Sequence, residues 1–294
     1  MNKSLQIKQI NSIKIKPVIT SNIKPENIAG YDFFTEPYCN VAIIAKKKSG
    51  KSSTLYNILK KCSGKNTRCW LFSSTVNKDP TYKAMIDMLE KRKSLVENFT
   101  HFKDENGNIL ENILEELKGK SESQSDSDSE HEGSGSQQQH NIFFKHTNLN
   151  FGEGGDKKDT PETKPDTETK IPKKRKIYPE QIFCFDDLGS DMRCKIIDIL
   201  LKTNRHYKSK VFLLGHTLTD LNPASRKQLD YCLIFKSFNE DKLKALYADL
   251  DLSIDFESFQ QAYQFATKDP YNFLYIDVKN DLLRKNFNTA ITFE

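Results

Sequence analysis

The sequence predicts an α/β fold in which a mostly parallel sheet is flanked by helices on both faces. Two observations predict it. Short, continuous apolar runs of strand length alternate along the chain with segments in which apolar residues recur every three or four positions. Continuous apolar strands indicate a sheet buried on both faces, and their alternation with amphipathic helices is typical of parallel strands joined by crossovers.

The chain predicts a single core domain that is interrupted by a long insertion. Residues 118–176 are rich in Ser, Glu, Asp, Gln, Gly and Pro, a composition that cannot bury enough apolar surface to offset the entropy of ordering. We therefore expect a disordered acidic insertion between a first core segment, 38–117, and a second, 177–294. Residues 1–37 are expected to form a basic N-terminal arm. Without the insertion roughly 235 residues remain, a normal size for one domain.

The first core segment predicts two strands, each followed by a helix. An apolar strand at Val41–Ala45 precedes a helix at Ser52–Lys61, in which apolar residues follow helical spacing. A second apolar strand is predicted at Arg68–Phe72. The helix after it covers Thr81–Lys93, because a proline stands where a helix tolerates one and Asp79 can cap its first turn.

The second core segment continues the same alternation. Its apolar runs predict strands at Gln181–Asp186, Lys210–Gly215, Asp230–Phe235 and Asn272–Val278. Its periodic segments predict helices at Ser190–Asn204, Asp241–Leu250 and Asp255–Lys268.

Composition excludes several classes of protein. The six cysteines include no C-x-x-C pair and no zinc-like spacing with histidine, so we expect buried free thiols in a reducing compartment. The sequence shows no secretory signal and no apolar run near the ~18 residues that a membrane helix requires. We expect a soluble intracellular protein with no membrane partner.

The charge of the chain is unevenly distributed. The net charge is +5, but residues 121–170 hold eleven Asp or Glu against five Lys or Arg, a balance of −6 that leaves +11 on the rest. Such a basic body fits a polyanion such as nucleic acid, and it also fits a solvated lysine-rich surface.

A P-loop (Walker A) pattern lies between the first predicted strand and helix. In A-K-K-K-S-G-K-S the glycine, Gly50, lets successive backbone N–H groups face phosphates, Lys51 reaches the β and γ oxygens, and the Ser52 hydroxyl ligates Mg²⁺. Alanine stands where the strict pattern begins with glycine. The predicted ATP-binding set is Ala45, Lys46, Lys47, Lys48, Ser49, Gly50, Lys51, Ser52 and Ser53.

Two acids complete the predicted site. The strand Gln181–Asp186 ends in Phe-Asp-Asp, a Walker B pattern that places the Asp186 carboxylate beside Mg²⁺. The second acid, Asp187, can then orient and deprotonate the attacking water. Many ATPases carry glutamate at this second position, which reaches further than aspartate.

These motifs resemble those of the DNA-packaging ATPases of virophages, Polinton-type elements and large eukaryotic DNA viruses, a branch of the FtsK–HerA superfamily. The resemblance covers most of residues 38–236 outside the insertion. It rests on the P-loop, the Phe-Asp-Asp pattern and four further runs, namely Trp70–Thr75, Asp79–Tyr82, Asn204–His206 and Val211–Thr217.

The resemblance implies a P-loop NTPase fold of the ASCE type, with the P-loop strand flanked by the Asp-bearing strand. It implies a homo-oligomeric ring that translocates double-stranded DNA, with a capsid or portal component as a further partner. An arginine of one subunit would complete the site of its neighbour. By position Arg205 matches this finger best and Arg226 second, although either could be a surface arginine paired locally. His216 stands where the family has a polar sensor, usually Gln or Asn.

Two readings compete with a DNA-translocating ATPase. A nucleotide kinase would need an arginine-rich lid, and no compact arginine cluster follows the P-loop. A nucleotide-gated DNA-binding scaffold without turnover would fit the alanine and aspartate departures. Separately, the basic run Pro172–Ile177 predicts nuclear import or only a charged linker end, and Ser125–Glu130 suits an acidophilic kinase.

Overall fold

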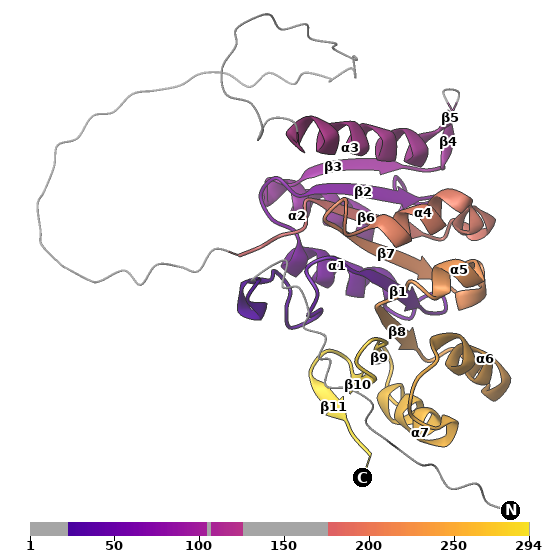
Figure 1. The fold of residues 1–294 in the computed structure, drawn as a ribbon. Coiled ribbons are helices and arrows are strands. Elements are labelled where there is room, and N and C mark those ends of the chain that lie inside the picture. Colours follow the sequence, from indigo (N-terminus) through magenta and orange to yellow (C-terminus); the bar gives the residue numbers. More distant parts are fainter. Residues whose placement is uncertain (1–22, 105–106, 126–175, 294) are drawn as a thin grey trace, which may run out of the picture. The chain divides into compact units, whose positions relative to one another are not determined.

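The computed structural model describes residues 23–104, 107–125 and 176–293. It divides into two compact units, residues 1–115 with 175–294, and residues 116–174. The first unit contains a nine-stranded sheet with helices on both of its faces (Figure 1). The predicted α/β fold class is confirmed.

The sheet is parallel in its centre and antiparallel at one end. Six adjacent strands, in the order β8-β1-β7-β6-β2-β3, are parallel, and β9, β10 and β11 extend the β8 side in antiparallel pairs. The strands are β1 (Asn40–Ile44), β2 (Arg68–Ser73), β3 (Leu95–Phe99), β6 (Gln181–Asp186), β7 (Ser209–Gly215), β8 (Tyr231–Phe235), β9 (Phe273–Asp277), β10 (Leu282–Lys285) and β11 (Thr289–Ile291).

One implied feature of the sheet is wrong. The Asp-bearing strand β6 does not flank the P-loop strand β1, because β7 lies between them. In register, Leu214 of β7 pairs with Ile43 on one side and with Asp186 on the other. Lys51 stands at the start of α1, beyond the end of β1, and its ammonium still lies 2.9 Å from Asp186 of β6.

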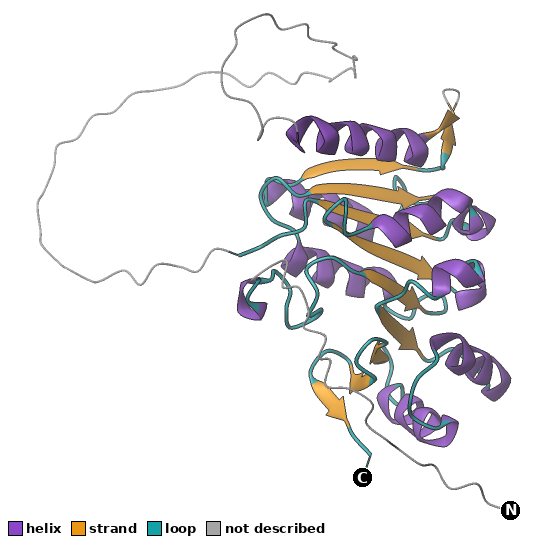
Figure 2. Ribbon diagram, in the orientation of Figure 1, coloured by secondary structure: helices purple, strands orange, loops and turns teal. Residues whose placement is uncertain are grey.

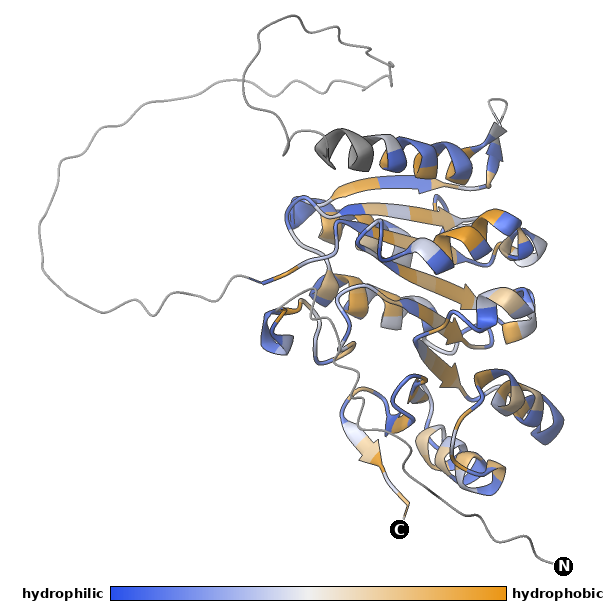
Figure 3. Ribbon diagram, in the orientation of Figure 1, coloured by the Kyte–Doolittle hydropathy of each residue, from blue (hydrophilic) through white to orange (hydrophobic). Residues whose placement is uncertain are grey.

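Helices cover both faces of the sheet (Figure 2). On one face α1 (Lys51–Cys62) and α2 (Pro80–Lys91) share one core with alternate residues of β1, including Val41 and Ile43. The intervening β1 residues point to the other face, where α4 (Lys195–Thr203), α5 (Pro223–Arg226) and α6 (Glu240–Leu250) lie. The central strands are mostly hydrophobic, as a sheet buried on both faces requires (Figure 3).

The sequence rules for helix starts hold at α2 and α7. The predicted cap, Asp79, accepts a hydrogen bond from the Thr81 amide at 2.8 Å. Asp255 accepts one from the Ser258 amide at 2.8 Å, at the start of α7 (Phe256–Ala266). Each side chain satisfies an amide that the helix itself leaves unpaired.

One predicted helix is wrong in part. Instead of one helix at Ser190–Asn204, the chain forms a 3-10 turn at Gly189–Arg193, becomes extended at Cys194, and only then enters α4. This turn buries Met192, and the extended backbone of Cys194 separates it from α4.

Several elements were not predicted. The sequence analysis missed the edge strand β3, the hairpin of β4 (Lys103–Asp104) and β5 (Gly107–Asn108), helix α3 (Ile109–Ser125), and strands β10 and β11. Short or half-exposed strands carry a weak pattern, which explains most of these misses.

The expected borders of the arm and the insertion also differ from the structure. Within the expected arm, Phe34 is fully buried, and its ring centroid lies 5.1 Å from that of Tyr231. Ile28, also in the expected arm, forms a parallel β-bridge to Ile177. Helix α3 continues to Ser125, eight residues into the expected insertion. Residues 126–175 lie outside the described residues, as do most of the predicted nuclear signal and all but the first residue of the predicted kinase site.

The six cysteines are free, and five of them are buried, as expected; Cys194 is partly exposed. Across the described part of the chain, no helix has both the length and the apolarity to cross a membrane.

Candidate functional site

The predicted site residues other than Arg205 lie at the carboxyl edge of the central strands. Strands β1, β7 and β6 are parallel and adjacent, so they end side by side. The P-loop follows β1, the two acids end β6, and His216 follows β7. Ligands of open α/β sheets bind outside this edge.

The P-loop is a tight turn fixed to the sheet. The buried Ala45 donates its amide to the carbonyl of Gly215 at 3.1 Å, so the position that departs from the strict motif packs in the core. Gly50 precedes α1 with φ 94°, a left-handed conformation that strains residues with a Cβ. Lys46, Lys47 and Lys48 at the loop tip are exposed.

Lys51 lies between the two acids. Its Nζ is 2.9 Å from Asp186 Oδ1 and 2.9 Å from Asp187 Oδ1. Burial alone would lower the pKa of Lys51, but the attraction of the two carboxylates outweighs it and raises the pKa above its ordinary value. The lysine is therefore held charged at the floor of the site.

Asp186 is the more buried of the two acids, and among the described residues only its Oδ2 oxygen has a hydrogen-bond donor in good geometry. Its Oδ2 accepts a hydrogen bond from the Tyr82 hydroxyl at 2.7 Å. Among the described residues its Oδ1 has no hydrogen-bond partner in good geometry, although the Lys51 ammonium is close. Burial raises the pKa of Asp186, while Lys51 and Tyr82 act in the opposite direction.

These atoms fit a divalent cation such as Mg²⁺. Mg²⁺ prefers hard oxygen ligands and usually takes one or two protein side chains, completing its shell with phosphate oxygens and water. The Oδ1 oxygen of Asp186, which faces the Lys51 ammonium, and the hydroxyl of the partly exposed Ser52 are ligands of this kind. No cluster of three or more His, Cys, Asp or Glu side chains forms a cation cage in the described ranges.

Asp187 faces open space. Its side chain is 35% exposed against 5% for that of Asp186, and its backbone has φ 52°. That left-handed conformation is uncommon outside glycine and is often found at functional turns. The carboxylate borders a cavity of about 380 Å³ that Lys47, Ser74 and Gly215 also line.

His216 is held next to Asp187. Its Nδ1 lies 2.9 Å from the Ala45 carbonyl, and its Nε2 lies 3.4 Å from Asp187 Oδ1. The Asp220 carboxylate accepts hydrogen bonds from the amides of His216 and Thr217, each at 3.1 Å. The predicted sensor position therefore contacts both the P-loop and the second acid.

Neither candidate arginine reaches this site within its own chain. Arg205 is exposed just before β7 begins, at the amino edge of the sheet. Because β7 has seven residues, about 20 Å of strand separate that edge from the P-loop. Arg226 is mostly buried, and its Nη1 lies 2.7 Å from Asp249 Oδ2.

Sequence reasoning missed three residues of this region. Tyr82 holds Asp186, Asp220 holds the turn at His216, and Arg193 donates to the Thr219 carbonyl on the same edge. Tyr82 lay within the runs that carried the family resemblance, but its role depends on α2 crossing over the end of β6. Spacing along the chain gives no signal for that contact.

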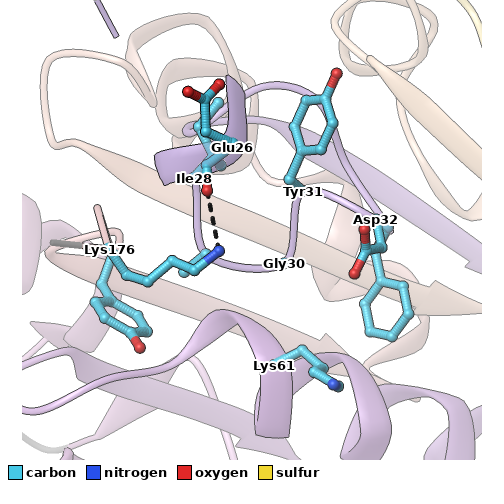
Figure 4. A pocket seen from close by; sticks show the side chains of 10 residues that line it. Glu26, Ile28, Gly30, Tyr31, Asp32, Lys61 and Lys176 are labelled. Atoms are coloured by element: carbon cyan, nitrogen blue, oxygen red, sulfur yellow. Dashed lines mark hydrogen bonds between the residues drawn. The ribbon is translucent and has the colours of Figure 1, made fainter. Parts of the chain in front are cut away.

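A separate cavity lies at the other end of α1 (Figure 4). Glu26, Tyr31, Lys61 and Lys176 line it, and the Lys176 ammonium donates to the Glu26 carbonyl at 3.0 Å. Figure 4 shows the lysine reaching across to this segment, next to the bridge that pairs residues 28 and 177. This cavity lacks the P-loop and the paired acids that lie at the carboxyl edge of the sheet.

Comparison with known proteins gives one similar sequence. No protein-family model matches the chain. It is 34% identical over 103 residues to the uncharacterized protein 075L of Invertebrate iridescent virus 6, a stretch that covers 34% of this chain and 40% of that protein. The chain therefore spans less than half of the length of this relative.

Among solved structures, the chain is similar to B204, the DNA-packaging ATPase from Sulfolobus Turreted Icosahedral Virus. The TM-score is 0.48 at 15% identity, over 84% of this chain and 96% of that one. The genome packaging NTPase B204 from Sulfolobus turreted icosahedral virus 2, in complex with ATP-gammaS, gives 0.48 at 15% identity over 85% and 98%. At this level of similarity no residue role passes from those proteins to this chain.

Proposed function

We propose that the protein is a Mg²⁺-dependent ATP hydrolase. The observation that carries the proposal is the convergence of Lys51, Asp186 and Asp187 within 2.9 Å, directly below a P-loop turn. A buried charge cluster is costly to desolvate, and strongly perturbed groups in a cleft are typical of functional sites.

Each residue has a distinct role in the proposal. Asp186 and Ser52 would hold Mg²⁺, which supplies charge neutralisation to the transferring phosphoryl group. Lys51 exchanges its carboxylate partners for the β and γ phosphate oxygens when the nucleotide enters. Asp187, released from Lys51 and exposed to the cavity, then orients the attacking water and accepts its proton.

His216 links the two halves of the proposed site. One ring nitrogen contacts the P-loop carbonyl of Ala45 and the other lies near Asp187. A change at the γ-phosphate that moves Asp187 would therefore also displace His216 and, through its contact with Ala45, the start of the P-loop. This contact supports the sensor role that the resemblance implied.

We further propose that hydrolysis drives translocation of double-stranded DNA, as in genome packaging. Support comes from the motif resemblance and from the +11 balance outside residues 121–170. The motor would work as a homo-oligomeric ring against a capsid or portal component. In such a ring Arg205, exposed and distant from its own P-loop, acts on the site of a neighbouring subunit. Cytoplasm, nucleus or virion are all compatible locations.

The experiment is steady-state ATP hydrolysis with Mg²⁺, in the presence and absence of double-stranded DNA. The motor predicts turnover that DNA stimulates. Phosphate transfer to a nucleoside acceptor instead of water would favour the nucleotide kinase. Nucleotide binding without any turnover would favour the scaffold.

A further inference from the structure

A small cavity lies beside the P-loop on the side away from the acids. It is lined by Lys48 and Ser49 of the loop, by Phe235 at the end of β8, and by the turn 269–272 between α7 and β9. Lys47, one residue earlier, lines the other cavity, together with Asp187 and His216. The P-loop therefore separates two cavities, one on each side.

The strand order decides which end of a nucleotide each cavity can take. Strand β8 pairs with β1 on the side opposite β7 and β6. The acids are on the β6 side, so the terminal phosphate must point there. A nucleotide laid along the loop then extends its base and sugar toward β8 and the turn 269–272 (Figure 1).

Tyr271 stands out in that turn. It is the most exposed large apolar side chain of the described residues, at 70%, and its backbone has φ 65°. A tyrosine in the left-handed region is an outlier of the kind that clusters at ligand sites.

The turn that carries Tyr271 is held rigidly from both sides. Asp269 pairs with the ammonium of Lys285 at 3.0 Å, and the Asn272 side chain accepts from Asn286 at 2.9 Å. Both partners belong to the β10 region. These contacts hold the turn on both sides of Tyr271, whose own ring remains exposed.

The ring lies against the phosphate loop itself. A Cβ added to Gly50 would come within 3.2 Å of Tyr271 Cδ1 and 3.9 Å of Phe235 Cε1. Gly50 therefore has a left-handed conformation that strains residues with a Cβ, and the Tyr271 ring lies close beside it.

We propose that Tyr271 is the stacking platform for the base of the bound nucleotide, and that the turn 269–272 forms the nucleoside subsite. This inference rests on the proposed ATP site. Stacking on an aromatic ring accepts any base, with a strength that grows with ring overlap. The subsite therefore prefers purine over pyrimidine nucleotides and treats ATP and GTP alike within a few-fold.

The test compares ATP with inorganic tripolyphosphate, which lacks a base, by calorimetry on the full chain. Tyr271→Ala weakens ATP binding about tenfold, the scale of one base–aromatic stack. It leaves tripolyphosphate binding unchanged. Tyr271→Phe keeps the ring and retains ATP affinity. Tyr31→Ala, which removes an exposed tyrosine from the cavity of Figure 4, changes neither affinity.

A second readout reports contact directly. In Tyr271→Trp the indole emission changes on addition of ATP but not of tripolyphosphate, because only ATP brings a base to the ring. Unchanged ATP affinity in Tyr271→Ala together with unresponsive Tyr271→Trp emission overturns the subsite while leaving the proposed function intact. A wild-type protein that binds neither ligand overturns the proposed function, and the subsite with it.

Discussion

The two edges of the central strands carry different kinds of charge. At the carboxyl edge, Lys51, Asp186 and Asp187 converge within 2.9 Å, and the side chains of the first two are 8% and 5% exposed. At the amino edge, Lys208 and Glu180 pair at 2.6 Å with both side chains more than half exposed. Exposed pairs contribute little to stability, whereas buried ones are costly to assemble.

This difference distinguishes the candidate functional site at the carboxyl edge from the protein surface at the amino edge. The carboxyl edge holds a preassembled group of charges that needs a ligand to rearrange it. At the amino edge Arg205 is exposed, its charge acts on Asp230, and the buried Lys210 lies at the same edge. About 20 Å of strand separate Arg205 from the P-loop of its own chain. In the proposed motor Arg205 acts on another subunit, which makes the comparison testable by mutation.

The largest expected effect comes from removing the arginine side chain of Arg205 at the amino edge. Arg205→Ala should lower ATP turnover about 10³-fold or more if it is a finger supplied to a neighbour, since such arginines contribute ~10³–10⁵ in rate. ATP binding should change far less. Arg226→Ala, which removes an arginine already paired with Asp249, is the matched comparison and should keep most of its turnover.

Mixing experiments distinguish whether Arg205 acts on the site of a neighbouring subunit or on the site of its own subunit. Subunits with Lys51→Ala and subunits with Arg205→Ala should be nearly inactive alone and partly active together, because some interfaces then combine an intact loop with an intact arginine. Mixtures that co-assemble and stay inactive contradict the assignment. Normal turnover in Arg205→Ala alone would transfer the role to Arg226.

The next effect concerns the division of labour between the two acids. Asp187→Asn should slow hydrolysis by roughly 10²-fold while ATP binds as before, because a general base contributes about 10²–10⁴. Asp186→Ala should weaken Mg-ATP binding and turnover together. Asp241→Asn, an exposed acid on α6, serves as control. If Asp187→Asn hydrolyses ATP normally, the base is another group.

A smaller effect should follow from the tyrosine that holds the metal-side acid. Tyr82→Phe removes one hydrogen bond at 2.7 Å from Asp186 and keeps the packing of the ring. We expect about tenfold more Mg²⁺ to be needed for half-maximal turnover, the lower range for residues that orient metal ligands. Turnover at saturating Mg²⁺ should be near normal. An unchanged Mg²⁺ titration would assign Tyr82 to packing alone.

The sequence predicted most of the parallel core because those strands are continuous and apolar. Gln181–Asp186 was predicted with the observed bounds, and the cap at Asp79 followed from a local rule. The antiparallel extension and the edge strand β3 were missed because half-exposed strands leave little periodic signal. The expected neighbour of the P-loop strand was also wrong, because β7 separates β1 from β6. The sequence of one strand does not indicate which strand it pairs with.

The candidate site was predictable in its types of residue and not in its contacts. The P-loop and the two acids each follow from a short pattern at a strand end. The ion pairs that join Lys51 to both acids, and the exposed Tyr271 beside Gly50, depend on distant segments meeting in space. Tyr271 is separated from Gly50 by most of the chain, so no spacing rule could have connected them.

The most direct test of the central claim is Lys51→Ala, measured for Mg-dependent ATP hydrolysis against Lys60→Ala, an exposed lysine on the same helix. Lys51 neutralises developing phosphate charge in this account, and such preorganised contacts typically contribute ~10²-fold or more. We predict that Lys51→Ala folds with an unchanged circular dichroism spectrum and loses at least ~99% of turnover, whereas Lys60→Ala retains it. A folded Lys51→Ala protein that keeps more than about a tenth of wild-type turnover would contradict the claim that this edge of the sheet is an ATPase site.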